Sequence, residues 1–407
     1  MRNVYILSAV RTPIGKYGGS LAAFSAPDLG VVAARAALER AGVQPDEVDE
    51  AIFGHARQAG NGPNPARQIA VRAGVPVEVP AVTVNQACAS GLKAIALGYD
   101  QIVMGRAEVV LAGGVEAMSR VPYFVEGARW GGRLGHQQLV DGMYQDGFLC
   151  PLSRMVMGET AELLAERYHI SREEQDAFAL TSQQRAARAL KTRRFNEEVT
   201  PVTIQDKKGE QVFTTDEHPR PDSSPQSLAK LPPVFSKSGT VTAGNSSGIT
   251  DAAAALVLAS EDWVTRSGRA PLARIAGYTL AGVDPKLMGL GPVPALRKLF
   301  ARNGRCLEDY DLVELNEAFA AQVLACDREL HFDRERLNVN GGAIALGHPI
   351  GCSGARIMVT LLHEMKKRGA RRGLATLCVS GGLGMAMEIE LAGDRVCSRA
   401  DNRPSVD

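Results

Sequence analysis

Two stretches far apart in the chain share the same order of apolar and polar positions. In the first, a helical pattern over 37–42 ends at Gly42, and an acidic turn leads into an apolar segment. In the second, the pattern over 299–304 ends at Gly304 and continues in the same way. Glycine is common just after a helix because it adopts positive φ without strain. Each half is therefore predicted to contain a helix followed by a strand.

The repetition continues along both stretches. Three further pairs of segments follow in the same order at a similar spacing: 82–85 with 337–340, Ser90-Gly91 with Ser353-Gly354 at a predicted helix start, and 109–114 with 376–382. Segments that repeat in order indicate an internal duplication. Strand, helix and strand in succession predict right-handed βαβ units and a largely parallel sheet in each half. The predicted fold class is α/β.

The segment between the repeats, 119–243, fits neither of them. Ser171 and Glu174 have capping-box spacing, which predicts a long helix from there to about Leu190. The polar, proline-rich stretch 206–230 predicts loops. We interpret 119–243 as an inserted domain that holds or covers a ligand. The predicted units are 1–118 plus 244–270 for the N-terminal half, 119–243 for the insert, 271–393 for the C-terminal half and 394–407 for a polar tail.

Composition narrows the class of protein. The chain has 407 residues, of which 45% are hydrophobic and 22% charged, as in soluble globular proteins. Its net charge is +1, so no strong field attracts nucleic acid. The longest apolar run, 252–259, is far shorter than the ~20 residues that cross a membrane, and the N-terminus has no basic leader. We expect a cytoplasmic protein without nucleic-acid or membrane partners.

The seven cysteines do not form a recognisable framework. Their number is odd, and no two are spaced as in a C-x-x-C motif. This argues against a set of disulfides and against a structural zinc site. We therefore expect thiols in a reducing compartment, and no metal.

Cys88 and Cys378 have neighbours that suggest chemistry. Cys88 lies where an apolar run ending at Val84 gives way to a helix-forming run, so it belongs to a strand-to-helix turn. N–H groups and the dipole at a helix start stabilise a thiolate, which predicts a lowered pKa. Cys378 takes the corresponding place in the second half. Two thiols at matching strand ends predict one cleft between the halves, although Cys88 as a buried structural cysteine is the alternative.

A histidine and an asparagine also lie at positions suited to catalysis. His348 lies in the glycine-rich segment 340–356, where few side chains can cover it, so it is predicted to face a cavity. A hydrogen-bonded loop histidine is the alternative. Asn316 follows the apolar strand predicted at 312–315, where an amide can hold a water or donate to an oxyanion. As an alternative, Asn316 caps a helix.

A short motif supports a rival function. The segment 244–248 satisfies G-x-S-x-G, in which Ser246 would be the nucleophile of a serine hydrolase. An extended segment over 240–243 and a predicted helix over 252–259 match its usual context. The hydrolase fold, however, has one sheet without duplication. No dinucleotide or P-loop motif is present, so no nucleotide cofactor is indicated.

Taken together and in this order, the motifs resemble those of the thiolase family. The similarity runs from Arg11 to Glu388 and includes the segments VNQACASG, NEAFAAQ, NGGAIALGHPIGCSGAR and LCVSGGLG. The segment 237–248 also resembles the family's coenzyme A-binding stretch. The resemblance implies a thiolase-like fold with layers α/β/α/β/α, in which an inserted loop domain accompanies two duplicated βαβ halves.

The resemblance implies reversible acyl transfer between coenzyme A thioesters, without a cofactor. It makes Cys88 the nucleophile that carries the acyl group and His348 the base that activates it. It makes Cys378 the acid and base at the α-carbon. Asn316 is implied to position a water that acts with His348, and the backbone N–H groups of Cys88 and Ser380 to form a second oxyanion hole.

Further contacts with substrate follow from the same resemblance. The residues implied to bind the substrate and coenzyme A are Met157, Arg220, Phe235, Ala243, Ser247, Met288, Ala318 and Phe319. Of the insert, Met157, Phe235 and Phe148 are expected near the acyl tail. The stretch around Met288 favours an acetyl-CoA acetyltransferase. Val156 stands where short-chain members often have histidine, so a 3-ketoacyl-CoA thiolase of β-oxidation with a broader chain-length range is the alternative.

Two further expectations concern activity and assembly. A catalytically silent acyl- or lipid-binding relative is a third hypothesis, against which both cysteines and His348 argue. A related condensing enzyme of fatty-acid synthesis would have one catalytic cysteine rather than two. The glycine-rich, aromatic stretch 123–147 is difficult for a monomer to bury, and with the resemblance it predicts a homotetramer, with a dimer as the alternative.

Overall fold

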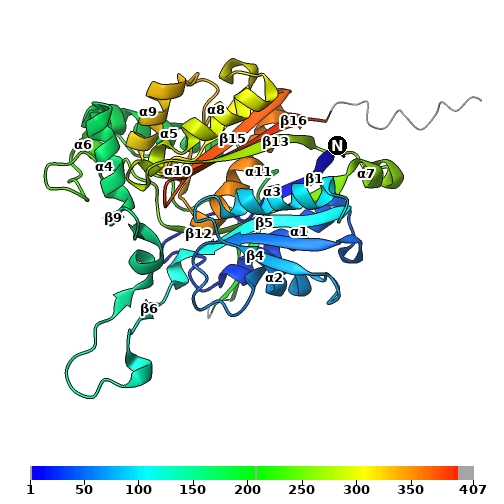
Figure 1. The fold of residues 1–407 in the computed structure, drawn as a ribbon, viewed down its shortest axis with the longest axis horizontal. Coiled ribbons are helices and arrows are strands. Elements are labelled where there is room, and N and C mark those ends of the chain that lie inside the picture. The colour runs from blue at the N-terminus through cyan, green and yellow to red at the C-terminus, as the bar shows by residue number, and fades with distance from the viewer. Residues whose placement is uncertain (1, 207–208, 393–407) are drawn as a thin grey trace, which may run out of the picture.

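One large sheet runs through both halves of the molecule (Figure 1). This computed structural model describes residues 2–206 and 209–392, and the predicted tail 394–407 lies outside them. In the N-terminal half the strand order is β1 (Val4–Arg11), β12 (Thr250–Ser260), β5 (Val109–Ala117), β3 (Glu50–His55) and β4 (Ala81–Val84). In the C-terminal half it is β13 (Ala273–Gly282), β16 (Leu383–Leu391), β15 (Arg372–Val379) and β14 (Leu312–Leu315). The short strand β2 (Gly15–Lys16) pairs with β12.

The strand order is the same in the two halves, and β1 pairs with β13 where they join. In this correspondence β13 matches β1, β16 matches β12, β15 matches β5 and β14 matches β3. Beyond β14, Leu337 bridges Val313 in parallel, just as β4 pairs in parallel with β3. The predicted duplication and the α/β class are confirmed.

The prediction that each half has a largely parallel sheet is wrong. β3 is parallel to β4 and β5, and β14 is parallel to β15, but the other strand pairs named above are antiparallel. β16 returns from β15 after only residues 380–382, and so short a turn permits only an antiparallel return. β12 re-enters the sheet after the insert and separates β1 from β5.

The apolar run 252–259 is a strand and not the predicted helix. It forms most of β12, and every residue of this strand is buried. A strand covered on both faces has apolar residues at every position, and its sequence alone does not distinguish it from a buried helix. Alanine favours helix in isolation, but here pairing with β1 and β5 on both sides overrides that preference.

Helices form three layers around the two halves of the sheet (Figure 1). α1 (Ala26–Ala41) and α2 (Pro65–Ala73) pack on the outer face of the N-terminal half, and α8 (Pro292–Asn303) packs on that of the C-terminal half, with α9 (Ala320–Leu330) beside it. α3 (Ser90–Val103) and α11 (Ile350–Arg368) lie between the halves. This arrangement confirms the predicted layers. Gly42 and Gly304 end α1 and α8 with φ of 63° and 69°, as expected for glycine caps.

The two central helices approach each other through glycines. A Cβ at Gly91 would lie 2.8 Å from the backbone N of Ala355, and one at Gly354 would overlap the backbone of Leu92. A side chain at either position would force α3 and α11 apart. α3 starts at Ser90 as predicted, whereas α11 starts at Ile350, directly after Pro349, so Ser353 lies within its first turn.

The segment between β5 and β12 lies mainly to one side of the sheet. Its helices are α4 (Met157–Arg167), α5 (Arg172–Lys191) and α6 (Pro225–Ala229), and its strands are β6 (Tyr123–Phe124), β7 (Val140–Asp141), β8 (Leu149–Cys150), β9 (Met155–Val156), β10 (Val202–Asp206) and β11 (Gly209–Phe213). Ser171 caps α5 with a capping box, which confirms the predicted long helix. Two short helices, α7 (Glu261–Ser267) and α10 (Ala343–Leu346), lie elsewhere. The predicted unit boundaries stay predictions.

Between β6 and β7 the chain forms an arm that projects from the body of the molecule (Figure 1). Within the residues described, no helix is both long and apolar enough to cross a membrane.

Candidate active site

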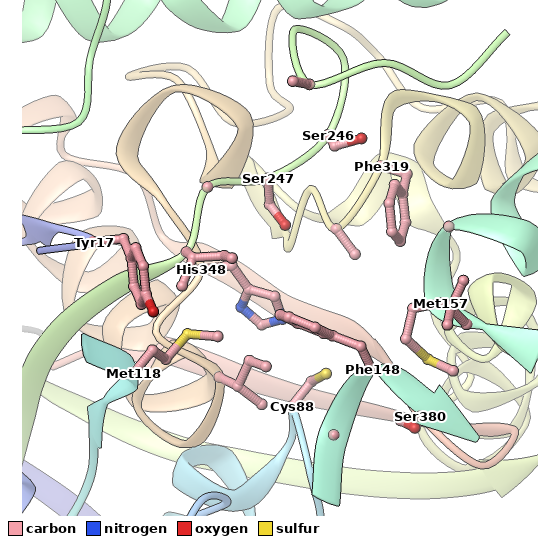
Figure 2. Close-up of a pocket in the computed structure, with 18 of the residues that line it drawn as sticks. Tyr17, Cys88, Met118, Phe148, Met157, Ser246, Ser247, Phe319, His348 and Ser380 are labelled. Carbon is pink, nitrogen blue, oxygen red and sulfur yellow. The ribbon is translucent and has the colours of Figure 1, made fainter. Parts of the chain in front are cut away.

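A cavity of about 710 Å³ contains nearly all of the residues predicted to act on substrate (Figure 2). Its volume is typical of a site for a small organic molecule. The predicted residues on its wall are Cys88, Met157, Arg220, Phe235, Ala243, Ser247, Met288, Ala318, Phe319, His348, Cys378 and Ser380. The two halves and the insert all contribute to this wall, as the predicted cleft requires.

Cys88 lies in a tight turn between β4 and α3. Ala87, directly before it, has a φ of 44°, an unusual conformation for a residue with a side chain. Asn85 Oδ1 accepts the N–H of Ala87 at 2.9 Å, and Ser90 Oγ donates to the carbonyl of Ala87 at 2.7 Å. Gln86 donates its N–H to the same Ser90 hydroxyl at 2.8 Å. Side chains on both sides of the turn thus hold it so that the Cys88 thiol faces the cavity.

The predicted lowering of the Cys88 pKa is wrong. Burial raises the pKa of this thiol, and this effect outweighs the backbone N–H of Ser380 and the charge of Arg57, which both lower it. Desolvation disfavours the thiolate more than the nearby dipoles favour it. Cys88 is therefore held as a thiol until a base takes its proton.

Cys378 is buried near the end of β15, opposite Gly384 of β16. The turn that follows carries Ser380 and reverses at Gly381 and Gly382, which have φ of 90° and 84°. Only glycine adopts such angles readily. The turn aims the N–H of Ser380 at Cys88, as the predicted oxyanion hole requires.

The sequence comparison predicted that Cys88 and Cys378 occupy corresponding places in the two halves. This prediction is wrong. Cys378 lies within β15, the counterpart of β5, whereas Cys88 follows β4, an edge strand. The segment that corresponds to the Cys88 turn is the one after Leu337, and it leads to His348. Cys88 and His348, not the two cysteines, are therefore related by the duplication.

His348 lies between α10 and α11. Its backbone N–H donates to the carbonyl of Gly248 at 2.9 Å, and its Nδ1 lies 2.5 Å from Ser353 Oγ. The Ser353 hydroxyl is also 3.0 Å from the carbonyl of Pro349 and has one proton to give. If that proton goes to Pro349, Nδ1–H of His348 donates to Ser353, and Nε2 has a free lone pair.

Nε2 of His348 is buried and has no hydrogen-bond partner among the described residues. Burial lowers the pKa of His348 to about 3, and the charges of Arg356 and Arg57 add to this effect. The ring is therefore neutral at physiological pH and can accept a proton. Burial likewise raises the pKa of Cys378 well above its usual value, helped by the neighbouring Cys88 and Cys326 thiols.

Asn316 is the one predicted residue that does not line the cavity among those described. It follows β14 as expected, and its side chain is buried, with both amide atoms unpartnered. A buried amide without a partner is unusual and marks a place for an ordered water. Asn316 does not cap a helix, because α9 begins only at Ala320.

Aromatic and methionine side chains form the apolar wall. The rings of Phe235 and Phe319 meet edge to face, with centroids 6.1 Å apart. Gly158 packs against Phe235 so closely that a Cβ there would overlap its ring. In Figure 2, Phe148 lies near Cys88, and Met157, which belongs to the same apolar cluster as Cys378, lies beyond it on the cavity wall.

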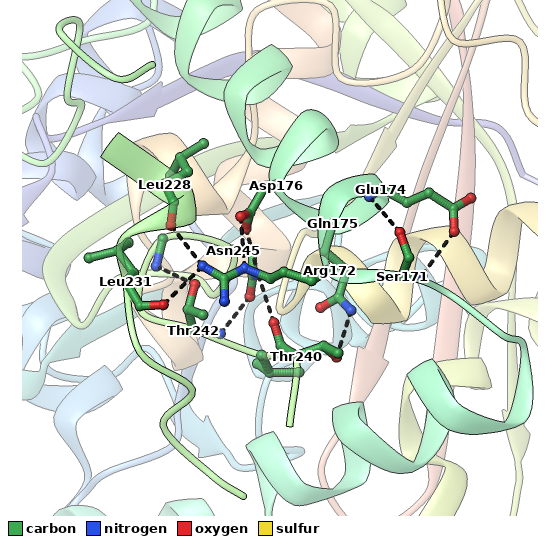
Figure 3. A network of polar contacts seen from close by, with 12 residues as sticks. Ser171, Arg172, Glu174, Gln175, Asp176, Leu228, Leu231, Thr240, Thr242 and Asn245 are labelled. Carbon is green, nitrogen blue, oxygen red and sulfur yellow. Dashed lines mark hydrogen bonds and ion pairs between the residues drawn. The ribbon is translucent and has the colours of Figure 1, made fainter. Parts of the chain in front are cut away.

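The loop 240–248 forms the opposite side of the cavity and is tied to α5 (Figure 3). Asp176 accepts from Asn245 Nδ2 at 2.9 Å and from Arg172 Nε at 2.7 Å. Gln175 Nε2 donates to Thr240 Oγ1 at 2.8 Å. The loop that includes Ser247 is therefore held in place by a helix of the insert.

Ser246 does not lie in a nucleophile elbow. Its hydroxyl donates to the carbonyl of Thr242 at 2.7 Å, and the chain after it enters strand β12 instead of the helix that the motif requires. The serine hydrolase hypothesis is wrong.

Several residues of the cavity wall were not predicted from the sequence, among them Tyr17, Arg57, Met118, His218 and Ile350. Arg57 lies two residues after β3 and Met118 one residue after β5, and these strand ends were the available signal. Within the residues described, no group of three or more His, Cys, Asp or Glu side chains is placed to hold a metal ion.

Comparison with protein families decides the relationship. Residues 4–262 match the family model of the thiolase N-terminal domain, and residues 269–391 match that of the thiolase C-terminal domain. The chain belongs to the thiolase family. The two family domains meet between β12 and β13, so the insert falls within the first of them.

Relatives of this thiolase match over nearly their whole length. An acetyl-CoA acetyltransferase of Pseudomonas aeruginosa is 53% identical over 390 residues, which cover 96% of this chain and 99% of the relative. The crystal structure of the Bacillus anthracis acetyl-CoA acetyltransferase matches with a TM-score of 0.94 at 50% identity, covering 96% and 99% of the two chains. Human mitochondrial 3-ketoacyl-CoA thiolase matches with a TM-score of 0.94 at 46% identity and the same coverage.

Proposed function

We propose that this thiolase is an acetyl-CoA C-acetyltransferase, which condenses two acetyl-CoA to acetoacetyl-CoA and CoA and catalyses the reverse cleavage. The observation that carries the proposal is the presence of two thiols, Cys88 and Cys378, with the neutral base His348 on one cavity wall. The names of the relatives support the same activity. Acyl-CoA and CoA are the partners, and no cofactor is needed.

Cleavage begins when Nε2 of His348 takes the proton of Cys88 and the sulfur attacks the 3-keto carbonyl. The bond between C2 and C3 breaks, which leaves the acyl group on Cys88 and an acetyl-CoA enolate. Cys378 gives its proton to the enolate carbon. The raised pKa of Cys378 suits this step because it keeps the group a thiol until the carbanion forms.

The second half of the cycle returns both protons. CoA enters as a thiol and gives its proton to the Cys378 thiolate, and its sulfur attacks the acyl group on Cys88. The Cys88 thiolate leaves and recovers its proton from His348. Cys88, His348 and Cys378 therefore end the cycle in their starting protonation states. Condensation is the same sequence in reverse.

The N–H groups of Cys88 and Ser380 point at the Cys88 thiol, and we propose that they donate to the thioester oxygen of the acyl-enzyme, where negative charge develops. We further propose that Asn316 holds a water that donates, with His348, to the other carbonyl oxygen. The unpartnered amide of Asn316 behind the cavity wall supports this role.

Acyl chain length is the second question. A broader 3-ketoacyl-CoA thiolase is favoured by the similarity to the human mitochondrial enzyme of that name and by the apolar Val156 on the wall. Met157 and Phe235 narrow the cavity and favour short chains instead. We favour acetoacetyl-CoA. The deciding measurement is kcat/KM for cleavage of 3-ketoacyl-CoA from four to sixteen carbons, and a maximum at eight or more would overturn this choice.

We also propose a homotetramer located in the cytoplasm. The arm between β6 and β7 exposes large apolar side chains, including Trp130, at 85%, and Leu134, at 98%. Exposed apolar groups of this size gathered on one segment favour contact with another copy. A mechanism that needs two free thiols suits a reducing compartment.

A further inference from the structure

Arg57 is a buried cation on the cavity wall for which the mechanism above has no use. It lies two residues after the end of β3, and only 6% of its surface is exposed. Its Nε is buried without a hydrogen-bond acceptor, and no acceptor for any of its guanidinium nitrogens is found within residues 2–206 and 209–392. A buried guanidinium without a partner is costly, so proteins rarely keep one unless a ligand completes it.

The nearby buried carboxylate does not pair with this side chain. Glu116 accepts the backbone N–H groups of Ala56, Arg57 and Gly351 at 3.3, 3.1 and 2.8 Å, and its Oε1 lies 3.1 Å from His55 Nε2. Three backbone N–H groups thus engage its two oxygens, and among the described residues no hydrogen bond joins them to the Arg57 guanidinium, although the charge of Arg57 helps to lower the pKa of Glu116. The guanidinium packs instead against Gly147, where a Cβ would overlap it. Its free donors are left to a group in the cavity.

The position of Arg57 indicates which part of a substrate it would meet. β3 and β4 are parallel neighbours, so Arg57 and Cys88 follow their ends at the same edge of the sheet. Asn85 Nδ2 ties the two turns together through the carbonyl of Ala56 at 3.1 Å. In Figure 2, Cys88 and Met118 lie on the far side of the cavity from Ser246, which belongs to the loop of the coenzyme A side. Arg57 thus faces the acyl group carried by Cys88 and not the phosphates of coenzyme A.

The walls between Cys88 and Arg57 are apolar. Met118, Phe148 and Ile350 pack together there and can cover methylene groups. An acyl chain that starts at the Cys88 sulfur and ends in a carboxylate would place its methylenes on these side chains and its charge at the guanidinium. Arginine binds carboxylates through two parallel hydrogen bonds, which gives it a strong preference for such a group.

We propose that Arg57 makes this end of the cavity a binding site for a carboxylate at the far end of the acyl chain, so that the enzyme cleaves CoA thioesters of 3-oxo dicarboxylic acids. The inference rests on the proposed thiolase activity and adds a second substrate class to acetoacetyl-CoA. CoA breaks the bond between C2 and C3, which yields acetyl-CoA and the CoA thioester of a dicarboxylic acid two carbons shorter. The terminal carboxylate does not react.

The test compares matched substrates that differ only in their far end. We would measure kcat/KM for thiolysis of the CoA thioesters of 3-oxohexanedioic and 3-oxohexanoic acids, and of the seven- and eight-carbon pairs. For at least one chain length, the wild-type enzyme is expected to prefer the dicarboxylic substrate by about 10- to 100-fold, the range for hydrogen bonds between charged groups. A ratio of one or less at all three lengths overturns the inference without any variant.

Variants then assign the preference to Arg57. In R57M the ratio is expected to fall to one or below, and in R57K, which keeps the charge but loses the paired donors, to lie between. Lys16→Met is the matched control, because Lys16 is a cation at the exposed mouth of the same cavity, with 57% of its side chain exposed. This control should keep the wild-type ratio.

Two outcomes would contradict the assignment. If R57M slows both substrates of a pair equally, Arg57 acts on Cys88 and not on the acyl end. If K16M lowers the ratio as much as R57M, the general field of the cavity and not a site at Arg57 is responsible. Cleavage of acetoacetyl-CoA by the wild type is measured beside these assays, because its absence refutes the proposed function itself and not the carboxylate site.

Discussion

The segments that link strand to central helix differ between the two halves, although the duplication relates them. In the N-terminal half, residues 85–89 join β4 to α3 directly and carry Cys88. In the C-terminal half, the chain after Leu337 includes the extra helix α10 before it reaches His348 and α11. The short turn is held by the side chains of Asn85 and Ser90, and its Ala87 has a φ of 44°. The longer segment is held by Asn338, which has a φ of 45° and hydrogen-bonds to the backbone of Leu315, and by the contacts of His348 with Gly248 and Ser353.

The difference shows how one architecture supplies two chemical roles. The short turn brings a thiol close to the start of α3 and to the N–H of Ser380. The longer segment allows a buried imidazole to reach the same cavity from the other half. The proposed nucleophile and base thus come from corresponding places, while the second thiol, Cys378, comes from a strand.

Replacing Cys88, the proposed nucleophile in the short turn, should lower the rate of thiolysis more than any of the substitutions that follow. We expect Cys88→Ala to lose thiolysis of acetoacetyl-CoA on the order of 10⁴-fold or more, because the acyl group then has no carrier. Wild-type enzyme incubated with acetyl-CoA should gain one acetyl mass on the peptide that contains Cys88, and the variant should gain none. Acetyl label on Cys378 would mean that the roles of the two thiols are reversed.

Removing the second thiol should separate the two half-reactions. Cys378→Ser should still acetylate Cys88, because that step does not involve the α-carbon. Formation and cleavage of the carbon–carbon bond should fall by roughly 10²–10⁴-fold, the usual contribution of a general acid or base. Mass spectrometry of the acetyl-enzyme and a thiolysis assay on the same sample check both statements. Thiolysis at the wild-type rate would exclude Cys378 from the mechanism.

The pH dependence of alkylation tests whether the short turn holds a thiol or a thiolate. Because burial raises the pKa of Cys88, the thiolate fraction should grow roughly tenfold per pH unit above neutrality. The rate of iodoacetamide alkylation, measured by mass of the Cys88 peptide, should therefore still rise at pH 9. Burial lowers the pKa of His348 to about 3, so no inflection from this group is expected between pH 5 and 8. A plateau at pH 7 would instead indicate a Cys88 thiolate paired with a charged His348.

Changing the partner of His348 tests the longer segment. Ser353→Ala removes the contact at Nδ1, so the ring can rotate and the wrong tautomer becomes populated. We expect kcat to fall by about 10-fold with little change in KM, in keeping with the loss of one hydrogen bond to a base. Ser353→Thr keeps the hydroxyl and should restore most of the activity. Equal losses in both variants would show that Ser353 acts only through packing.

A further difference is the arm from β6 to β7, which belongs to the insert between β5 and β12. Leu134→Asp with Trp130→Ser should convert a tetramer into a dimer, since both side chains are exposed on one chain. Light scattering should report half the mass, while kcat changes by less than about twofold because neither residue lines the cavity. A wild-type mass of 43 kDa, that of one chain, would contradict both the tetramer and the dimer.

Local signals allowed much of the fold to be predicted. The capping box at Ser171 and the glycines at 42 and 304 act within a few residues, so helix ends could be identified from sequence. Strand direction in the sheet and the state of 252–259 could not, because they depend on which distant strands lie on either side. A run of alanine and leucine reads the same in a helix and in a strand that is buried on both faces.

The candidate site follows the same division. Motif resemblance pointed to Cys88, His348 and Cys378 as the reacting residues, and these three line one cavity. The pKa of Cys88 was predicted in the wrong direction, because the helix start is visible in the sequence but the degree of burial is not. Arg57 was missed because its place after a strand end, the one signal available, does not tell a cavity residue from a surface arginine. The role proposed for Arg57 depends on its guanidinium having no hydrogen-bond acceptor among the described residues.

The glycine contacts between α3 and α11 have a consequence for how this enzyme can evolve. Backbone packing at Gly91 and Gly354 sets the separation of the two helices, and Cys88 and His348 lie just before their first turns. Side chains such as Phe148 and Met157 contribute nothing to that separation. Selection can therefore exchange the lining of the cavity, and with it the accepted substrate, while the reacting atoms stay in register. Substitution of Gly91 or Gly354 is not free in this way, because a larger residue at either position would displace Cys88 and His348 relative to each other.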